Sequence, residues 1–351
     1  MTTADASAPA RGRVLVTGGG GFLGRAIVER LLARGDRVRV FARGTYPELI
    51  ARGAELIRGD ITDREAVSAA CRGCDVVIHV AARAGVWGTY REFFEPNVRG
   101  TEHVVAACRA AGVARLVFTS SPSVVFDGRD LENADESLAY PRRFASHYSA
   151  TKALAEQLVL AANDRHLRTL ALRPHLVWGP RDPHIVPRLI AQARAGRLVQ
   201  VGDGHNRIDS TYIDNAAEAH LLAADALASN PNAAGRAYFI TNGQPLPAWE
   251  LINRILAAAG LPPVRRRISR RTARIVGAGL EAVHRVLRLP GEPRLTRFLA
   301  DELATSHWFN ISAAARELGY APRITIAEGL KRLEDWLRGS PDPAAQPPQA
   351  S

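Results

Sequence analysis

Tyr148 and Lys152 lie four positions apart in a stretch whose residue spacing favours a helix. On a helix such residues share one face, so the ammonium group lies near the phenol and favours its ionised form. A tyrosine tuned in this way can give a proton to a substrate oxygen or take one from it. Lys152 is one of only two lysines in a chain with 46 Lys and Arg residues, where a site needing only a cation would be expected to use arginine. The pair therefore predicts acid–base catalysis.

A glycine-rich segment near the N-terminus has the pattern of a dinucleotide-binding turn. The apolar run at 14–16 predicts a buried strand, and it leads through TGGGGFLG at 17–24 into residues with helical spacing. Gly18, Gly21 and Gly24 allow a tight turn, close approach of the backbone to a pyrophosphate and close packing of helix on strand. The phosphates are expected at the N-terminus of this helix.

The end of the next expected strand indicates which nucleotide binds. An NAD-dependent enzyme places an acidic residue about 20 positions after the glycines, on the ribose 2′-hydroxyl. Here Ala42 leaves room and Arg43 supplies a guanidinium group, which suits a 2′-phosphate. The alternative is a solvated arginine at a strand end, since the chain is rich in arginine. The sequence favours NADP(H) over NAD(H).

Alternating strands and helices must position these residues. The pattern predicts an α/β fold: a Rossmann doubly wound parallel sheet with a smaller, mainly helical C-terminal substrate domain. Strands are expected at 13–16, 37–41, 55–58, 75–80, 115–119 and 168–173, with helices near 22–33, 64–71, 98–111 and 146–164. Ligands of such sheets bind beyond the carboxyl ends of the strands. Those ends carry Arg43, Asp60, Ala81-Ala82-Arg83, Ser120-Ser121 and Pro174-His175, which are therefore expected to converge on one crevice.

Several ordered motifs resemble those of the extended short-chain dehydrogenase/reductases, in the branch of the 3β-hydroxysteroid and sterol-4-carboxylate dehydrogenases. The matching segments are TGGGGFLG at 17–24, GDITD at 59–63, HVAARAG at 79–85, EPNVRGT at 95–101, FTSSPSVVFDG at 118–128, HYSATKALAE at 147–156, LRPHLVWGP at 172–180 and YIDNAAEAHLLA at 212–223. The resemblance covers roughly residues 13–338. Within this branch, the stretch from Ser121 to Tyr148 is most similar to the 2-alkyl-3-oxoalkanoate reductases of bacterial long-chain olefin biosynthesis.

The resemblance implies roles for individual residues. Ser121 would hold the substrate oxygen, with Ser120 and Ser123 as competitors, because adjacent serines in extended chain face opposite sides. Tyr148 would be the general acid in reduction, and Lys152 would bind the nicotinamide ribose and lower the pKa of the tyrosine. Further expected nucleotide contacts are Gly18, Gly21, Phe22, Leu23, Gly24, Arg43, Asp60, Ile61, Ala81, Ala82 and Pro174, with Asp60 and Ile61 at the adenine. Asn97 would brace the active-site loop or serve a turn.

The favoured function is NADP(H)-dependent reduction of a long-chain 2-alkyl-3-oxo acid to the 3-hydroxy acid. The candidate substrate contacts are Arg83, Ser123, His175 and Arg181, of which Arg83 or Arg181 would hold the carboxylate. Oxidation of a 3β-hydroxysteroid or sterol carboxylate is the main alternative. A sugar-nucleotide epimerase, with Arg207 on the pyrophosphate, or a non-catalytic NADP(H) sensor is less favoured. His147 is expected at the substrate rim or in packing, and His79 in the core.

Composition and turn-forming residues predict the domain organisation. Residues 1–12 predict a disordered lead, 13–178 the NADP-binding domain with 209–242 returning to it, 179–338 the substrate domain, and 339–351 a disordered tail. With neither a signal core nor a long apolar run, a soluble cytoplasmic enzyme is expected, with a homodimer as its assembly. Cys71 and Cys74 form C-x-x-C without a second pair, so we expect no metal site there.

A basic amphipathic segment at 265–288 has no place in the chemistry above. It carries eight arginines and a single acid, Glu281, interleaved with aliphatic residues. One interpretation is a lip at the pocket mouth that contacts membrane lipid or a partner enzyme of the same pathway and admits a lipid-like substrate. The other is a helix with a solvated basic face. Nucleic-acid binding does not account for the net charge of +11, because no aromatic platform or known module accompanies it.

Overall fold

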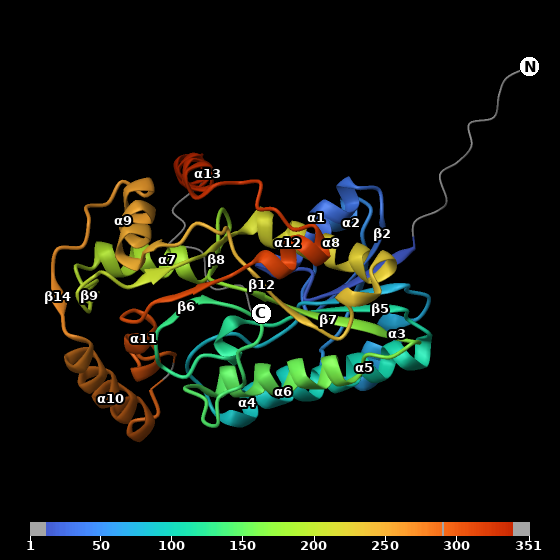
Figure 1. Cartoon of the computed structure of the whole chain (residues 1–351), viewed down its shortest axis with the longest axis horizontal. Coiled ribbons are helices and arrows are strands. Elements are labelled where there is room, and N and C mark those ends of the chain that lie inside the picture. Colours follow the sequence, from blue (N-terminus) through green and yellow to red (C-terminus); the bar gives the residue numbers. More distant parts are fainter. Residues whose placement is uncertain (1–11, 290, 340–351) are drawn as a thin grey trace, which may run out of the picture.

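A seven-stranded parallel sheet organises the chain in the computed structural model, which describes residues 12–289 and 291–339 (Figure 1). The strand order is β12-β7-β5-β4-β1-β2-β3, with every neighbouring pair parallel. The strands are β1 (Arg13–Thr17), β2 (Arg37–Ala42), β3 (Glu55–Arg58), β4 (Val76–His79), β5 (Arg115–Thr119), β7 (Arg168–Pro174) and β12 (Ala237–Ile240). The central strands are apolar along their length because helices cover both faces of the sheet.

Helices form a layer on each side of this sheet (Figure 1). On one side lie α1 (Phe22–Ala33), α8 (Ile213–Ser229) and α12 (Ser312–Leu318), with the short α2 (Pro47–Ala51) near them. On the other side lie α3 (Arg64–Cys71), α5 (Gly100–Ala111) and α6 (His147–Ala161), preceded by α4 (Tyr90–Phe94) and a π-helical turn at Glu95–Arg99. Two apolar clusters fill the spaces between the layers and form the core of the nucleotide-binding half.

A second, smaller sheet builds the other half of the molecule. Its order is β13-β10-β15-β6, formed by β13 (Leu246–Pro247), β10 (Arg207–Ile208), β15 (His307–Phe309) and β6 (Leu131–Ala134). Two further pairs join β8 (Val177–Trp178) to β11 (Thr211–Tyr212) and β9 (Gln200–Val201) to β14 (Arg267–Ile268). The helices of this half are α7 (Ile185–Arg194), α9 (Ala248–Ala258), α10 (Arg270–Val286), α11 (Arg297–Glu302) and α13 (Ile326–Gly339). Two 3-10 turns, Pro122–Val124 and Pro231–Ala233, complete the elements.

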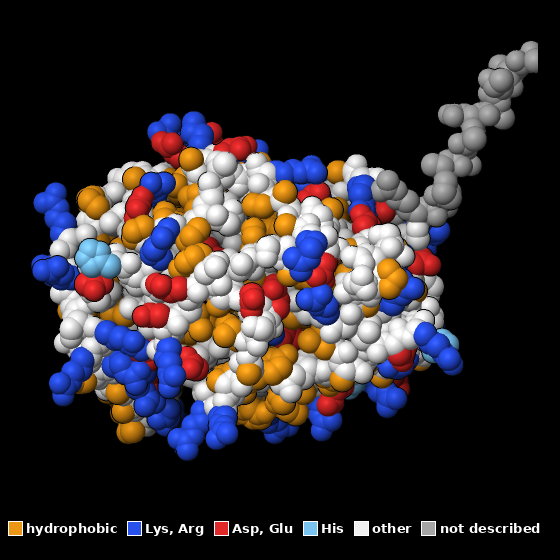
Figure 2. Space-filling model, viewed as in Figure 1, with side chains coloured by type: hydrophobic (Ala, Val, Ile, Leu, Met, Phe, Trp, Pro, Cys, Tyr) orange, Lys and Arg blue, Asp and Glu red, His pale blue; other side chains and the backbone are white. Residues whose placement is uncertain are grey.

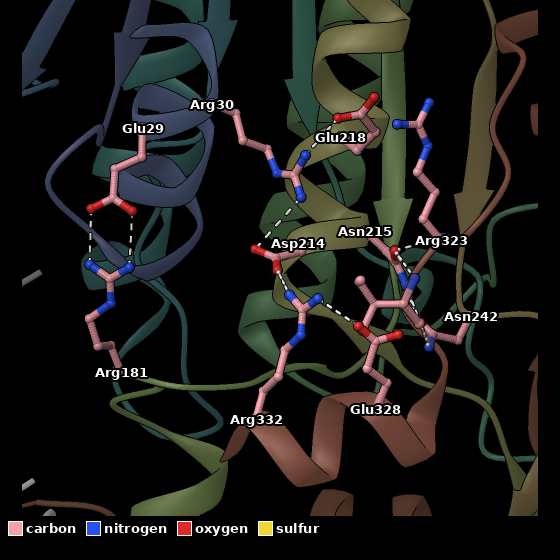
Figure 3. A network of polar contacts seen from close by, with 11 residues as sticks. Glu29, Arg30, Arg181, Asp214, Asn215, Glu218, Asn242, Arg323, Glu328 and Arg332 are labelled. Atoms are coloured by element: carbon pink, nitrogen blue, oxygen red, sulfur yellow. Dashed lines mark hydrogen bonds and ion pairs between the residues drawn. The ribbon is translucent and has the colours of Figure 1, made fainter. Parts of the chain in front are cut away.

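The C-terminal helix α13 is tied back to the nucleotide-binding half by ion pairs (Figure 3). Arg332 binds Asp214 at the start of α8 at 3.0 Å, and Asp214 also lies 3.8 Å from Arg30 of α1. Nearby, the Asn215 side-chain oxygen accepts the backbone N–H groups of Arg323 and Ile324. Solvent-accessible ion pairs and partly buried hydrogen bonds of this kind join the two halves beside the crevice between them.

The expected α/β architecture is confirmed, and all six expected strands occur within one or two residues of their predicted bounds. The segment 209–242 supplies α8 and the edge strand β12 of the main sheet. The four-stranded sheet was not anticipated, because its strands are two to four residues long and widely separated in the chain. The expected lead and tail lie outside the described residues, except for Gly12 and for Gly339, which ends α13. Among the described helices, none is long and apolar enough to cross a membrane.

Candidate active site

The glycine turn after β1 is shaped by contacts that leave no room for side chains. The Gly18 N–H donates to the Phe41 carbonyl at 2.8 Å, and the residue has a φ of +67°. A Cβ at Gly18 would meet the Ala81 backbone at 2.8 Å, and one at Gly24 would meet the Gly18 carbonyl oxygen at 2.1 Å. The turn therefore brings bare backbone and the N-terminus of α1 to the crevice, as a pyrophosphate requires.

Phe22 and Leu23 open α1 directly after this turn and are partly buried. A further residue beside the glycine turn, Tyr46, was not expected from the sequence. The ring of Tyr46 lies against Gly20, so that a Cβ there would overlap the ring. Tyr46 thus covers the turn beside Arg43.

Arg43 follows β2 and extends from the crevice, exposed to solvent. Arg58, at the end of the neighbouring strand β3, donates its Nε–H to the Arg43 carbonyl at 3.3 Å, so two guanidinium groups stand at this edge. Neither makes an ion pair with any described residue. The charge of Arg43 also helps to hold the pKa of Asp60 below its usual value, although burial opposes this and hydrogen bonds from Thr62 contribute more. Two free cations beside the ribose-binding end of the turn fit a 2′-phosphate.

The loop after β4 lies opposite the glycine turn. Ala81 packs against Gly18, and its N–H donates to the Thr17 hydroxyl at 3.3 Å. Asn97 holds the same loop from the π-helical turn: its Oδ1 accepts the Arg83 N–H at 2.7 Å and its Nδ2 donates to the Arg83 carbonyl at 3.1 Å. The Asn97 amide also donates to Thr151, one residue before Lys152. Asn97 is therefore a brace between the loop and α6.

Further nucleotide candidates occupy the rim of the crevice. Asp60 accepts two hydrogen bonds from Thr62 after β3, and Ile61 packs against Gly100 at the start of α5. Ala82 is partly buried next to Ala81, and Pro174 ends β7. The structure thus places the expected residues along one edge of the sheet, from β1 to β7.

The three serines after β5 face different surroundings. Ser121 and Ser123 both line a cavity, and the Ser121 hydroxyl donates to the Ser123 hydroxyl at 3.0 Å. Ser120 is buried and does not line that cavity, and its Oγ has no hydrogen-bond partner among the described residues. The side chains of Ser120 and Ser121 face opposite sides because the backbone is extended here, as expected from the sequence.

Tyr148 enters the same cavity from the first turn of α6. Burial raises the pKa of its phenol above the usual value, and a hydrogen bond with Ser121 opposes this increase. The phenol is therefore protonated at neutral pH and ready to act as an acid. The expectation that Lys152 lowers this pKa stays a prediction; in the free protein the Lys152 ammonium group donates to the Thr119 carbonyl.

Lys152 is buried against the end of β5. Its Nζ donates to the Thr119 carbonyl at 2.6 Å and lies 4.0 Å from the centre of the Phe118 ring. Burial lowers the pKa of Lys152 to about 7, and the nearby carboxylate of Glu156 opposes the decrease. A proton on this amine is consequently held only loosely at neutral pH.

Glu156, missed by the sequence analysis, lies one turn beyond Lys152 and is fully buried. Arg173 of β7 binds its carboxylate with two hydrogen bonds, at 2.6 and 3.0 Å, and the Tyr140 hydroxyl donates to it at 2.7 Å. The spacing of Tyr148, Lys152 and Glu156 at i, i+4 and i+8 was the signal in the sequence, since all three share one helix face.

The cavity that receives Ser121 and Tyr148 has a volume of about 280 Å³. Its other walls are mainly apolar, with Phe126, Leu131, Leu176, Ile185, Phe298 and Phe309 among them. The lining residues that can carry charge are Tyr148, His175, Glu302 and His307. Within the described part of the chain, neither lysine nor arginine lines this cavity.

His175 forms a buried chain of hydrogen bonds across one wall. Its Nδ1 lies 2.6 Å from Asp209, its Nε2 lies 3.1 Å from Nδ1 of His307, and the Nε2 of His307 lies 2.8 Å from the Glu302 carbonyl. Asp209 also accepts the Phe309 N–H at 2.8 Å, so both of its carboxylate oxygens have a partner.

The proton count of this chain is set by its partners. Because the Glu302 carbonyl can only accept, His307 carries its proton on Nε2 and offers the lone pair of Nδ1 to His175. Burial lowers the pKa of His307, which keeps that ring neutral. His175 then donates from Nε2 to His307, and its Nδ1 faces the Asp209 carboxylate. His175 was expected as a substrate contact, but His307, 132 positions away, was missed.

The two arginines expected to hold a carboxylate lie elsewhere. Arg181 points away from the cavity to α1, where its two terminal nitrogens each lie 3.0 Å from a carboxylate oxygen of Glu29 (Figure 3). The expectation that Arg181 holds the substrate carboxylate is therefore wrong, because the Glu29 carboxylate of α1 binds the Arg181 side chain through two contacts. Arg83 is exposed, lies over the Phe93 ring and faces a larger groove instead.

This groove, of about 1510 Å³, continues from the cavity toward α10. Ala84, Val86 and Phe298 line both spaces, so the groove adjoins the cavity of Ser121 and Tyr148. Its walls carry arginines from α10 and its C-terminal end, together with Arg83, Arg143 and aromatic side chains such as Trp87. The arrangement suits a substrate with a polar head in the cavity and long chains in the groove.

Other residues singled out from the sequence lie outside the chemistry. His79 is fully buried between the hydroxyls of Thr17 and Thr101, and burial lowers its pKa to about 3. His147 is exposed and lines the groove, as expected for a rim residue. Arg207 donates to the Pro245 carbonyl at 2.8 Å and lies over the Trp308 ring, which leaves it poorly placed for a pyrophosphate. The cysteines Cys71, Cys74 and Cys108 are free thiols in the core.

The sequence matches known proteins over nearly its whole length. Residues 15–269 match the 3-beta hydroxysteroid dehydrogenase/isomerase family. A 2-alkyl-3-oxoalkanoate reductase of Stenotrophomonas maltophilia is 53% identical over 92% of this chain and 98% of its own. One of Shewanella oneidensis is 48% identical over 96% of this chain and 89% of its own. The human sterol-4-alpha-carboxylate 3-dehydrogenase is 34% identical over 93% and 88% of the two chains.

Solved structures show the same architecture at lower identity. MoeE5 in complex with UDP-glucuronic acid and NAD superposes with a TM-score of 0.72 at 27% identity, covering 94% of this chain and all of that one. The Thermus thermophilus UDP-glucose 4-epimerase in complex with NAD has a TM-score of 0.70 at 29% identity, with the same coverage. These neighbours hold a nicotinamide dinucleotide on the fold described above.

Proposed function

Since the chain belongs to the 3-beta hydroxysteroid dehydrogenase/isomerase family, within the extended short-chain dehydrogenase/reductases, we propose that it reduces the ketone of a long-chain 2-alkyl-3-oxo acid with NADPH. It is an oxidoreductase. The observation that carries the substrate assignment is the cavity itself, in which Ser121 and Tyr148 share a space with the His175–His307 pair.

The chain's own groups perform the acid–base part of the reaction. When bound, the nucleotide would supply the hydride that adds to the ketone carbon. Tyr148, protonated in the free protein, gives its proton to the ketone oxygen, and the Ser121 hydroxyl donates a hydrogen bond to the same oxygen as negative charge develops. Ketone, hydride and proton together make the 3-hydroxy acid. Lys152 in its ammonium form stabilises the phenolate that remains.

The proposed carboxylate contact is the histidine pair, one of whose N–H groups would exchange its present partner for the ligand. In a 3-oxo acid the carboxylate is separated from the ketone carbon by one carbon atom, so both groups must fit the same small cavity. Among the described residues, His175 and His307 are the side chains on its walls with N–H groups to offer an anion, whereas Arg181 is bound to Glu29. The Glu302 carboxylate lies 3.9 Å from His307 and opposes an anionic ligand, so the two histidines must outweigh it.

We propose NADP(H) as the nucleotide because Arg43 and Arg58 form a cationic edge where an NAD-specific site has an acid. We also propose a homodimer, for which the exposed Leu154 on α6 offers an apolar contact. Sedimentation velocity with wild type and Leu154→Ser tests the assembly. An unchanged distribution for the variant would remove α6 from the interface.

Substrate panels test the assignment in the oxidative direction, because 3-hydroxy acids do not lose carbon dioxide as 3-oxo acids do. A 2-alkyl-3-hydroxy acid should be turned over with NADP⁺ in preference to its methyl ester, a 3β-hydroxysteroid and UDP-glucose. His175→Gln should lower the kcat/KM for the acid by about tenfold or more, the loss expected for a hydrogen bond to a charged group, and spare the ester. His147→Gln, at the exposed rim, is the matched control. A wild-type preference for the steroid would replace the proposal by the steroid dehydrogenase.

A further inference from the structure

The helix α10 has its polar and apolar faces reversed. Of the nine large apolar side chains that are exposed in the described part of the chain, six lie between Ile275 and Leu289. They are Ile275, Val276, Val283, Val286, Leu287 and Leu289, with exposed fractions from 41% to 78%. The first five recur at helical spacing on one side, which makes a continuous apolar stripe.

Charged side chains occupy the inward face. Arg270 and Arg274 both bind Asp301 of α11, and the buried Glu281 binds Arg297 of the same helix. Gly277 packs so closely that a Cβ would meet the Thr296 backbone at 2.9 Å. Arg270, Arg274, Glu281, His284 and Arg285 also line the groove. Ion pairs therefore hold α10 in place, and its apolar stripe faces outward.

Unpaired arginines lie just before this stripe in the chain. Arg265, Arg266, Arg267 and Arg271 are exposed, and none makes an ion pair with a described residue. Glu281 is the one acid between 265 and 289, and it is buried. Figure 2 shows basic side chains gathered at the lower left, where Figure 1 places α10, with apolar side chains at the outer margin.

The charges beside the apolar stripe indicate which kind of partner covers it. An exposed apolar stripe of this length indicates a surface that is covered by something else. A second copy docked face to face would bring two sets of arginines together without acids to balance them. A bilayer with anionic headgroups matches both the apolar stripe and the arginines. Aliphatic side chains enter the boundary of the acyl chains, and arginines bind the phosphates of the headgroups.

We infer that the outward face of α10, from Ile275 to Leu287, docks on an anionic phospholipid bilayer. The docked helix would place the groove, and through it the catalytic cavity, at the membrane surface. This docking goes beyond the proposed reaction and does not depend on which ketone is reduced.

Vesicle sedimentation of the full-length protein tests the inference. Wild type should bind vesicles that contain phosphatidylglycerol much more strongly than vesicles of phosphatidylcholine alone, with binding weakened by salt. Ile275→Ser with Val286→Ser should lower binding by at least about tenfold, and Arg266→Gln with Arg271→Gln by about 25-fold, since each arginine near an anionic surface contributes about fivefold. Ile50→Ser, which changes an exposed apolar residue of α2, is the matched control and should bind as wild type does.

Kinetics separate this inference from the proposed function. All four proteins should turn over a short, soluble 3-hydroxy acid equally, because the substitutions lie away from the cavity. Absence of binding to anionic vesicles at low salt would overturn the inference, as would equal binding by the α10 apolar variant. Concentration-dependent dimerisation that the α10 apolar variant abolishes would assign the face to a second copy and equally overturn it.

Discussion

Lys152 and Glu156 lie one turn apart on the buried face of α6, and the negative charge of Glu156 keeps the pKa of Lys152 from falling further. Each is anchored to the central sheet, Lys152 through the Thr119 carbonyl and Glu156 through Arg173. The proton on the lysine therefore depends on a carboxylate that never contacts the substrate cavity. Glu156 is a positioning residue in this sense, acting on the chemistry through Lys152.

The pH dependence follows from this pair. With a pKa of about 7, Lys152 loses its charge as the pH rises through neutrality, so kcat/KM for reduction should fall on the alkaline side. Removing the carboxylate lowers that pKa, and Glu156→Gln should move the alkaline limb to lower pH. The pH profile with a short soluble substrate measures this shift.

A folding control is needed because Glu156→Gln leaves Arg173 without its buried partner. The double variant Glu156→Gln with Arg173→Gln removes both charges and should show the same displaced limb. An unchanged alkaline limb of the pH profile in a folded variant would show that Glu156 does not set the pKa of Lys152.

Tyr148→Phe should lower kcat by at least about two orders of magnitude, because the proton donor is lost from the cavity. NADPH binding and thermal stability should remain close to those of wild type. Ser121 is the hydrogen-bond partner that shifts the pKa of the phenol, so the variant loses little besides this hydrogen bond. Fluorescence titration and a melting curve check both. Near-normal turnover by the variant would assign the acid to another group.

Arg43→Ala should weaken NADPH by about tenfold or more and leave NADH nearly unchanged, because a charged hydrogen bond to the 2′-phosphate is lost. Equilibrium binding of both nucleotides measures the effect. Arg37→Ala, an exposed arginine at the opposite end of the same strand, is the control and should change neither affinity. Tighter binding of NADH than of NADPH by wild type would count against NADP(H).

Gly24→Ala should abolish nucleotide binding, because its Cβ would lie 2.1 Å from the Gly18 carbonyl oxygen and would force the turn open. Gly279→Ala provides the contrast: a Cβ there meets nothing within 4 Å, and alanine favours a helix over glycine by about 1 kcal/mol. Calorimetry should show a higher melting temperature for Gly279→Ala. Normal NADPH affinity of Gly24→Ala would show that the turn tolerates a side chain.

The nucleotide-binding half was predictable because its signals are local. Strand, glycine turn and helix follow one another within 13–33, and Tyr148, Lys152 and Glu156 repeat at helical spacing. The position of Arg181 was not predictable, since nothing near it in the sequence indicates that Glu29 binds it.

The substrate wall could not be predicted, for a physical reason. His307 meets His175 only through a sheet whose strands are too short to show alternation of apolar and polar residues. The reversed faces of α10 were equally hidden, because periodicity shows that a helix is amphipathic and not which face turns inward.

The order of the small sheet bears on how the protein emerges from the ribosome. β15 lies between β10 and β6, so β6 remains without its partner until residues 307–309 have been synthesised. The main sheet, by contrast, is complete once β12 has emerged. A chain interrupted between these points has every strand of the nucleotide-binding sheet but lacks the part of the cavity wall that His307 and Phe309 supply. Nascent protein therefore gains its cofactor site first and its substrate selectivity last.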